Sequence, residues 1–160
     1  MVARHLFISI ADQRLFLFKH GRCEKSFLIS TAKNGVGEIT NSYCTPRGWH
    51  EVADIIGLDQ PINTVFKARQ PTGQIYTPEL EQKFPDQDWI LTRIIRLKGR
   101  EIGFNAGENC DTYERFIYIH GCADDAPLGQ PESHGCIRMS NQAVTQLAAN
   151  IYWGDSVFIG

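Results

Sequence analysis

Hydrophobic residues alternate with other residues near the start of the chain, which is the pattern of strands with one buried face. Three such runs occur within the first thirty residues, over 6–10, 15–18 and 27–30. Polar residues and a glycine, at 12–13 and 20–21, separate the runs where turns are needed. The pattern predicts two consecutive hairpins that form a meander.

Residues 31–90 are less regular and are interrupted by proline at positions 46, 61, 71, 78 and 85. A proline lacks the backbone N–H that a central strand donates to its neighbour. Aromatic and aliphatic residues are spread through the same stretch, which argues against disorder. We therefore predict short strands joined by ordered loops in this region.

The second half returns to regular patterns. The β-branched run over 89–97 and the shorter run over 116–119 predict two strands, and residues 156–159 predict a last one. Apolar residues with the spacing of one helix face lie at Val144, Leu147, Ala148 and Ile151. Ser140 or Asn141 can cap that helix. The chain is expected to be one mainly β domain over residues 1–160, with a single helix near its C-terminus.

The net charge of −2 gives no electrostatic reason to expect a nucleic acid or an anionic membrane as partner. No run approaches the ~18 apolar residues of a membrane span. The N-terminal segment also lacks the long apolar stretch and cleavage site of a signal peptide, so the compartment stays open. The basic run over 93–100 is interpreted as a solvated strand face. No sequence feature indicates the oligomeric state.

The five cysteines leave at least one thiol unpaired within the chain. Three cysteines outside the distinctive motifs are expected to pack as small hydrophobic residues: Cys23, Cys44 and Cys110. Three histidines outside the motifs are expected at the surface: His5, His20 and His50. The remaining residues of these two types concentrate in one stretch of the second half.

That stretch reads Tyr118-Ile-His120-Gly121-Cys122 and then Ser133-His134-Gly135-Cys136-Ile-Arg138. A thiol is mostly protonated at neutral pH and needs a nearby base before it attacks a carbonyl carbon. His120 can be that base for Cys136, and the carbonyl of Gly121 can fix its tautomer by accepting from the ring N–H. The N–H groups of Gly135 and Cys136 are candidates for an oxyanion hole. The pattern predicts acyl transfer by a cysteine nucleophile.

The two segments resemble the catalytic signature of the L,D-transpeptidase (YkuD-type) catalytic domain family. That family carries an upstream His-Gly and, roughly fifteen residues later, Ser/Thr-His-Gly-Cys. Here 15 residues separate His120 from Cys136. The segment 45–48, Thr-Pro-Arg-Gly, also resembles the family's Thr-Pro-x-Gly turn. The run into His120 and the C-terminal helix and strand lie where the family has them, so the resemblance covers nearly the whole chain.

The resemblance implies a β-sandwich of mixed sheets with one helix in the C-terminal region. The catalytic positions that it implies are Cys136, His120, His134, Gly135 and Gly121, and the substrate-binding positions are Arg138, Ser133 and Tyr118. The implied partner is a peptidoglycan stem tetrapeptide, attacked at the carbonyl of its third residue, usually diaminopimelate, with loss of D-alanine. Arg138 would meet a substrate carboxylate. Acylation by carbapenems is implied as well, and no cofactor or metal is.

Alternative functions remain open from the sequence. Water as acyl acceptor would make the enzyme an L,D-carboxypeptidase. The doubled His-Gly-Cys could instead bind zinc, although zinc ligand pairs are usually two to four residues apart. A domain that binds peptidoglycan without chemistry is a third possibility. Cys122 stands where the family usually has Thr or Ser, either as a small substitute or as a thiol that pairs with an oxidised Cys136.

Overall fold

The computed structural model describes residues 3–160, and strands make up most of its regular secondary structure. The ten strands are β1 Arg4–Ser9, β2 Arg14–Lys19, β3 Arg22–Ser30, β4 Gly48–Ile56, β5 Thr64–Lys67, β6 Gln70–Ile75, β7 Leu91–Gly99, β8 Tyr118–Gly121, β9 Ile137–Met139 and β10 Ser156–Ile159. The helices are α1 Pro78–Lys83, the 3-10 helix η1 Glu108–Cys110 and α2 Asn141–Ala148.

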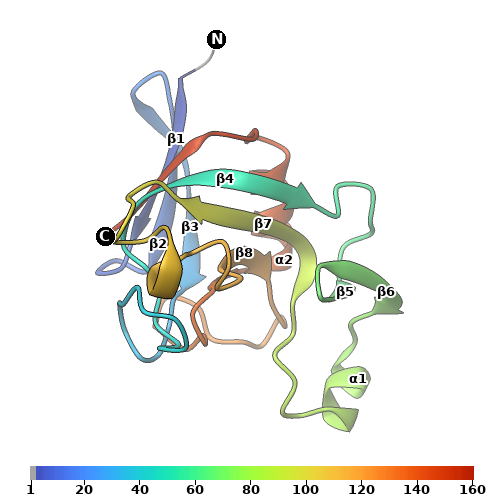
Figure 1. Ribbon diagram of the computed structural model, residues 1–160. Helices are drawn as coiled ribbons and strands as arrows, with labels where there is room; N and C mark the ends of the chain where they lie inside the picture. Colours follow the sequence, from blue (N-terminus) through green and yellow to red (C-terminus); the bar gives the residue numbers. More distant parts are fainter. Residues whose placement is uncertain (1–2) are drawn as a thin grey trace.

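The strands form one mixed sheet in the order β4-β10-β1-β2-β3-β9-β8-β7-β5-β6, and an added β4–β7 pairing closes it into a barrel-like sandwich. β1 pairs with β10 and β8 with β9 in parallel, and the other pairings are antiparallel. The β5–β6 hairpin and α1 extend from one end of the barrel (Figure 1). The expectation of a mainly β, mixed-sheet fold is confirmed.

The N-terminal meander is also confirmed. β1 and β2 pair from Arg4↔Lys19 to Ser9↔Arg14, and β2 then pairs with β3. Alternate side chains of these strands enter the largest hydrophobic core, where α2 supplies Val144 and Leu147, both fully buried. The Ser140 hydroxyl caps α2 by accepting the N–H of Ala143, as the sequence predicted. Burying one face of each element in this way holds the barrel together.

The secondary structure differs from the predictions in four places. β4 is nine residues long, because the prolines that interrupt the middle of the chain flank it and do not fall within it. α1 was not expected, although Thr77 caps it and Pro78 opens it, which is a recognised helix start. Phe116 lies outside β8, with a φ of 57° that breaks the predicted strand. β9 was not predicted, because three residues are too few to show the alternation of a strand.

Predicted exposure also fails at several positions. Cys23 is exposed. His50 is fully buried, with Nδ1 3.0 Å from the Gly48 carbonyl oxygen and Nε2 3.0 Å from the Thr112 hydroxyl. Arg93 and Arg96 are buried, since β7 lies in the middle of the closed sheet and has no solvated face. Buried polar side chains of this kind need partners within the protein.

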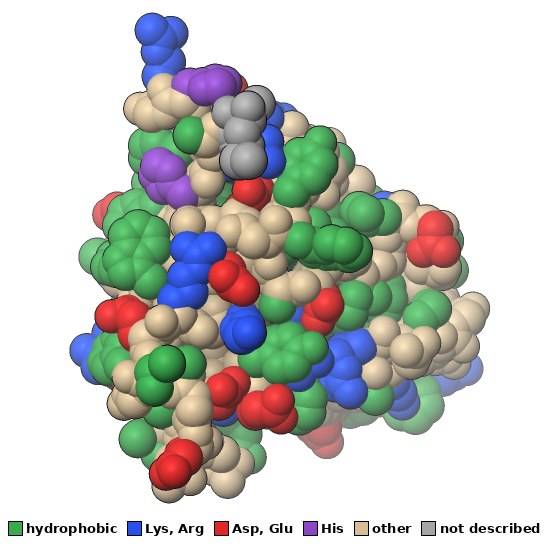
Figure 2. All heavy atoms as spheres, turned by 45° about the horizontal axis from the view of Figure 1, so that its top comes forward, with side chains coloured by type: hydrophobic (Ala, Val, Ile, Leu, Met, Phe, Trp, Pro, Cys, Tyr) green, Lys and Arg blue, Asp and Glu red, His purple; other side chains and the backbone are tan. Residues whose placement is uncertain are grey.

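Neither sign of charge dominates the face of the molecule shown in Figure 2. Figure 2 shows acidic and basic side chains interspersed on the face that it presents. No helix among residues 3–160 is long and apolar enough to cross a membrane.

His50 generates a prediction about stability. Burial lowers the pKa of His50 from 6.5 to about 4. Above pH 6.5 the ring is neutral in both folded and unfolded chains, but below it only the unfolded chain takes up the proton. The free energy of unfolding should therefore fall by about 3 kcal/mol as the pH drops to 4. Urea titrations across this pH range measure the fall in the free energy of unfolding. His50→Gln should abolish this fall, whereas His20→Gln, at an exposed position, should show the same fall as the wild type. If the free energy of unfolding of His50→Gln fell with pH as steeply as that of the wild type, His50 would not be the source of the pH dependence.

Candidate active site

The parallel pairing of β8 with β9 brings the two sequence segments together. Ile119 lies opposite Ile137, and His120 lies opposite Arg138, so the preceding residues Tyr118 and Cys136 are also neighbours. Ile119 and Ile137 point into the main core. Because side chains alternate along a strand, Tyr118, His120, Cys136 and Arg138 share the other side of the sheet. The sheet therefore gathers four of the predicted site residues on one face.

The Cys136 thiol is held between two backbone groups. Its sulfur accepts the N–H of Tyr118 at 3.3 Å and donates to the carbonyl of Phe116 at 3.4 Å. Burial raises the pKa of Cys136 to about 12, and the Tyr118 N–H and Arg138 only partly oppose it. The resting sulfur is consequently a neutral thiol. Among residues 3–160 its hydrogen bonds are to the backbone, and none joins it to His120.

His120 is buried, and its tautomer is fixed. Its Nδ1 lies 2.7 Å from the carbonyl oxygen of Gly121, which can only accept a hydrogen bond, so Nδ1 carries the hydrogen. The hydrogen bond expected from the sequence is thus present, and Nε2 keeps its lone pair in the neutral ring. Burial lowers the pKa of His120, with the Gly121 hydrogen bond acting in the opposite direction. A neutral imidazole can accept a proton.

Glycine is required at two of the site positions. A Cβ at Gly121 would lie 2.3 Å from the Asn141 Oδ1 and 2.6 Å from the Leu91 carbonyl oxygen, so no larger residue fits. Gly135 has a φ of +133°, which side-chain-bearing residues rarely adopt. These glycines shape the backbone on either side of the His120 and Cys136 side chains.

The loop before Cys136 is braced by the Ser133 hydroxyl. This oxygen donates to the Cys136 carbonyl at 2.6 Å and accepts the Gly135 N–H at 3.2 Å. The Thr45 hydroxyl donates to the Gly135 carbonyl at 2.9 Å, which ties the Thr-Pro-Arg-Gly segment to the same loop. The Gly135 N–H is therefore already engaged, which leaves the Cys136 N–H as the better candidate for an oxyanion donor. Because its hydroxyl is already bonded within the loop, Ser133 serves to position the loop.

Arg138 is paired in the resting structure. Its Nη2 lies 2.9 Å from one oxygen of Asp88, whose other oxygen lies 3.5 Å from Nδ1 of His134. Arg138 also donates to the Glu132 carbonyl at 3.3 Å. Asp88 comes from the segment between α1 and β7. A carboxylate thus already occupies the position on Arg138 where the sequence predicted that of a substrate.

Two cavities meet at His134, whose side chain is 67% exposed. One has a volume of about 210 Å³ and is lined by Asp88, Trp89 and Arg138, among others. The other has a volume of about 220 Å³ and is lined by Tyr43, Arg115, Phe116 and Ile117, among others. His134 lines both cavities and stands two residues before Cys136. Space is therefore available on both sides of His134.

The disulfide between Cys122 and Cys136 is excluded in this arrangement. Cys136 lies opposite Tyr118, four residues before Cys122, which corresponds to about 13 Å along a strand. A disulfide needs Cα atoms within about 7 Å. The buried Cys122 thiol instead donates to the Met139 carbonyl at 3.1 Å, and burial raises its pKa to about 11. Cys122 acts as a small packing residue.

No zinc site is built by the doubled His-Gly-Cys. Within residues 3–160 no group of three or more His, Cys, Asp or Glu side chains could hold a metal ion. His120 and Cys122 direct their polar atoms at separate backbone carbonyls, while the exposed His134 faces Asp88. Each potential ligand is engaged by a different part of the chain.

Several residues around the site escaped the sequence reasoning. Asp88 lies in the segment 84–90, whose composition indicates only a turn. Phe116 contributes its carbonyl through a backbone conformation that its residue type does not favour. The side chain of Arg69, on the β5–β6 turn, donates to the Tyr118 hydroxyl at 3.1 Å. A contact between a turn and a distant strand leaves no periodic pattern in the sequence, so it could not be predicted.

A cysteine and a neutral histidine on one face of a mixed β-barrel are the residue types that acyl transfer through a thiol requires. A sequence model of the L,D-transpeptidase catalytic domain, YkuD, matches residues 3–159. The chain therefore belongs to the L,D-transpeptidase catalytic domain family. A search of curated proteins found no match.

Solved structures of L,D-transpeptidases have a similar fold. The enzyme from Mycobacterium smegmatis is 17% identical, with a TM-score of 0.59 over 99% of this chain and 59% of its own. L,D-transpeptidase 3 from Mycobacterium tuberculosis, solved with a faropenem-derived adduct, gives 17% identity and a TM-score of 0.59 over 99% and 60%. The enzyme from Xylanimonas cellulosilytica gives 18% and 0.57 over 99% and 60%. This chain thus spans about three-fifths of these solved chains.

The raised pKa of Cys136 leads to a prediction. Because burial disfavours the thiolate, alkylation of Cys136 by iodoacetamide should be slow at pH 7 and should rise up to pH 10 without a plateau. Peptide mapping by mass spectrometry at each pH separates Cys136 from the other cysteines, and Cys136→Ser provides the blank. A plateau reached between pH 5 and 7 would instead indicate a preformed thiolate–imidazolium pair.

Proposed function

We propose that this chain catalyses L,D-transpeptidation of peptidoglycan stem peptides through a thioester on Cys136. The observation that carries the proposal is the placement of Cys136 and His120 on one face of adjoining parallel strands in a member of this family. The single catalytic domain predicted over residues 1–160 is part of the same proposal. The coordinating geometry for a zinc module, the main alternative, is missing from residues 3–160.

Acylation begins from a neutral pair. As the tetrapeptide binds, the Cys136 thiol leaves the Phe116 carbonyl and turns toward Nε2 of His120. Nε2 takes the S–H proton while sulfur forms its bond to the carbonyl carbon of the third residue. The C–N bond to D-alanine then breaks, and its nitrogen takes the proton from His120. The Gly121 carbonyl supports this step, because it stabilises the positive charge that His120 carries meanwhile.

The oxyanion of the tetrahedral intermediate falls near the Cys136 N–H. The Ser133 hydroxyl holds the loop in place by bonding the Cys136 carbonyl and the Gly135 N–H. Such preorganised donors stabilise a developing charge without having to reorient during the reaction. Ser133 and Gly135 are accordingly positioning residues.

Arg138 must exchange partners when substrate binds. Asp88 is 42% exposed and holds the Arg138 guanidinium at 2.9 Å, so an incoming carboxylate competes with an ion pair that contributes little by itself. A planar guanidinium can donate two parallel hydrogen bonds to an incoming carboxylate, whereas Asp88 receives only one from Arg138. Asp88 thereby keeps Arg138 oriented in the empty site.

The second half of the reaction releases the thioester. An amine on a second stem loses its proton to His120 and attacks the thioester carbon, and sulfur recovers the proton as the C–S bond breaks. The two cavities that meet at His134 provide separate places for donor and acceptor. Water in place of the amine gives an L,D-carboxypeptidase, which is the second candidate.

The test is to incubate the protein with a disaccharide-tetrapeptide and to identify the products by mass spectrometry. We expect cross-linked dimer and free D-alanine, whereas tripeptide alone would indicate the carboxypeptidase. Cys136→Ala should abolish turnover, and His120→Ala should lower kcat by several orders of magnitude, without adding to the loss in the double variant.

A fold control accompanies this test. Both variants should keep the circular dichroism spectrum of the wild type, because neither replacement removes a residue of the main hydrophobic core. Turnover by Cys136→Ala at the wild-type rate would refute the cysteine mechanism. Substrate unchanged by the wild type would refute the proposed activity.

A further inference from the structure

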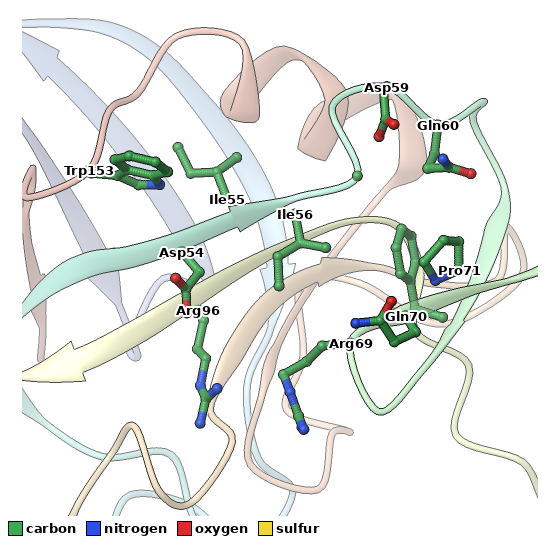
Figure 3. A pocket seen from close by; sticks show the side chains of 12 residues that line it. Asp54, Ile55, Ile56, Asp59, Gln60, Arg69, Gln70, Pro71, Arg96 and Trp153 are labelled. Carbon is green, nitrogen blue, oxygen red and sulfur yellow. The ribbon is translucent and has the colours of Figure 1, made fainter.

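A cavity of about 490 Å³ is lined by Arg69 and Arg96, and it shares no lining residue with the two cavities at His134. It is lined by β4, the loop after β4, the β5–β6 turn and β7. In Figure 3 the guanidinium groups of Arg69 and Arg96 extend in the same direction from two different elements. The mechanism above uses neither arginine.

Arg96 is 8% exposed, and its Nε has no hydrogen-bond partner among the described residues. Its Nη2 donates to the Tyr113 carbonyl at 2.8 Å, and its guanidinium stacks on the Tyr113 ring. No carboxylate within residues 3–160 lies within 4.0 Å of it. A buried cation without a close counter-ion is costly, which points to an anion from outside the chain.

Arg69 is carried on a strained turn. Lys67 pairs with Gln70, so Ala68 and Arg69 form a two-residue hairpin turn with φ values of 47° and 64°. Glycine and asparagine normally occupy such positions, and other residues there cost free energy. Strain of this kind is retained where it holds a side chain in a required place. Like Arg96, Arg69 forms no ion pair with a described residue.

The two arginines converge on one aromatic ring. The guanidinium carbons of Arg69 and Arg96 lie 4.7 Å and 5.1 Å from the centre of the Phe116 ring. The carbonyl of Phe116 accepts from the Cys136 thiol, and Arg69 also bonds the hydroxyl of Tyr118, whose N–H reaches the same sulfur. An anion held by these arginines would therefore be separated from the Cys136 sulfur only by Phe116 and Tyr118.

The cavity also contains negative charge, which limits the ligand. Asp54 lies opposite Arg96 in the pairing of β4 with β7, and Asp59 lines the loop that follows. The carboxylate of Asp54 accepts from the Tyr113 hydroxyl at 3.2 Å. A phosphate, with up to two negative charges, would be repelled by these carboxylates. A group that carries both a carboxylate and an ammonium ion suits two arginines beside two aspartates.

We propose that this cavity binds the zwitterionic amino-acid head group of a substrate, with its carboxylate between Arg69 and Arg96 and its ammonium group toward Asp54. The inference rests on the proposed function, because a stem peptide whose third residue ends in such a head group would present it here. It assigns the specificity for that head group to Arg69 and Arg96, which form no ion pairs with described residues.

Binding to a Cys136→Ala background tests the proposal without turnover. Two disaccharide-tetrapeptides are compared by isothermal titration calorimetry, one with a free side-chain carboxylate on its third residue and one with the carboxamide. We expect the free form to bind at least about tenfold more tightly, as a charge-assisted hydrogen bond implies. Adding Arg69→Gln should reduce the preference to less than about twofold. Adding Arg96→Lys, which keeps the charge but not the planar fork, should reduce it in part.

The matched control is Arg22→Gln, which removes the same charge from an exposed position outside the cavity and should keep the full preference. Unchanged preference in Arg69→Gln would overturn the proposal, and so would an equal loss for both peptides. Inorganic phosphate that displaces the free form more strongly than the peptide binds would assign the site to phosphate instead. If neither peptide binds and the wild type turns neither over, the proposed function itself fails; turnover with unchanged preference removes only this site.

Discussion

The parallel pairing of β8 with β9 is the constraint on which the site depends. It sets His120 opposite Arg138 and Tyr118 beside Cys136, and it sends the alternate residues Ile119 and Ile137 into the main core. A slip of one residue would exchange these two faces and turn the His120 and Cys136 side chains into the main core. Because the strands lie in the interior of a closed sheet, the packing of the whole barrel resists such a slip. The packing of the core thereby fixes the positions of Cys136 and His120 relative to each other.

Burial then decides the charge state of the pair. It raises the pKa of Cys136 and lowers that of His120, so both groups are neutral before substrate arrives. The sulfur is directed at backbone groups in the meantime, and the Gly121 carbonyl keeps the histidine in the tautomer that can accept a proton. Carboxylates and guanidinium groups surround this neutral centre. In the proposed mechanism, charge develops on the pair only as sulfur attacks the substrate carbonyl, and the surrounding groups stabilise it there.

Elements and site residues marked by a regular period or a motif could be predicted from the sequence. Features that depend on long-range contacts could not. Alternation placed the meander, and β-branched content placed β7. Helical spacing with Ser140 placed α2. The His-Gly and Ser-His-Gly-Cys segments brought out the site residues, and the Gly121 hydrogen bond followed from chemistry alone. His50 and Arg96 were misjudged as exposed, because burial depends on how the sheet closes. The ion pair of Arg138 with Asp88 joins segments 50 residues apart, and no local pattern records it.

The measurement that most directly tests this account is the mass of the intact protein after exposure to a carbapenem, followed by peptide mapping. A carbapenem offers a strained acyl group to the thiol that we propose as the nucleophile toward the stem peptide. The account predicts one adduct per chain, on Cys136, which is lost in Cys136→Ala and strongly slowed in His120→Ala. An adduct on Cys122 would contradict the assignment of the nucleophile. So would an unmodified protein from a preparation that still turns over the tetrapeptide.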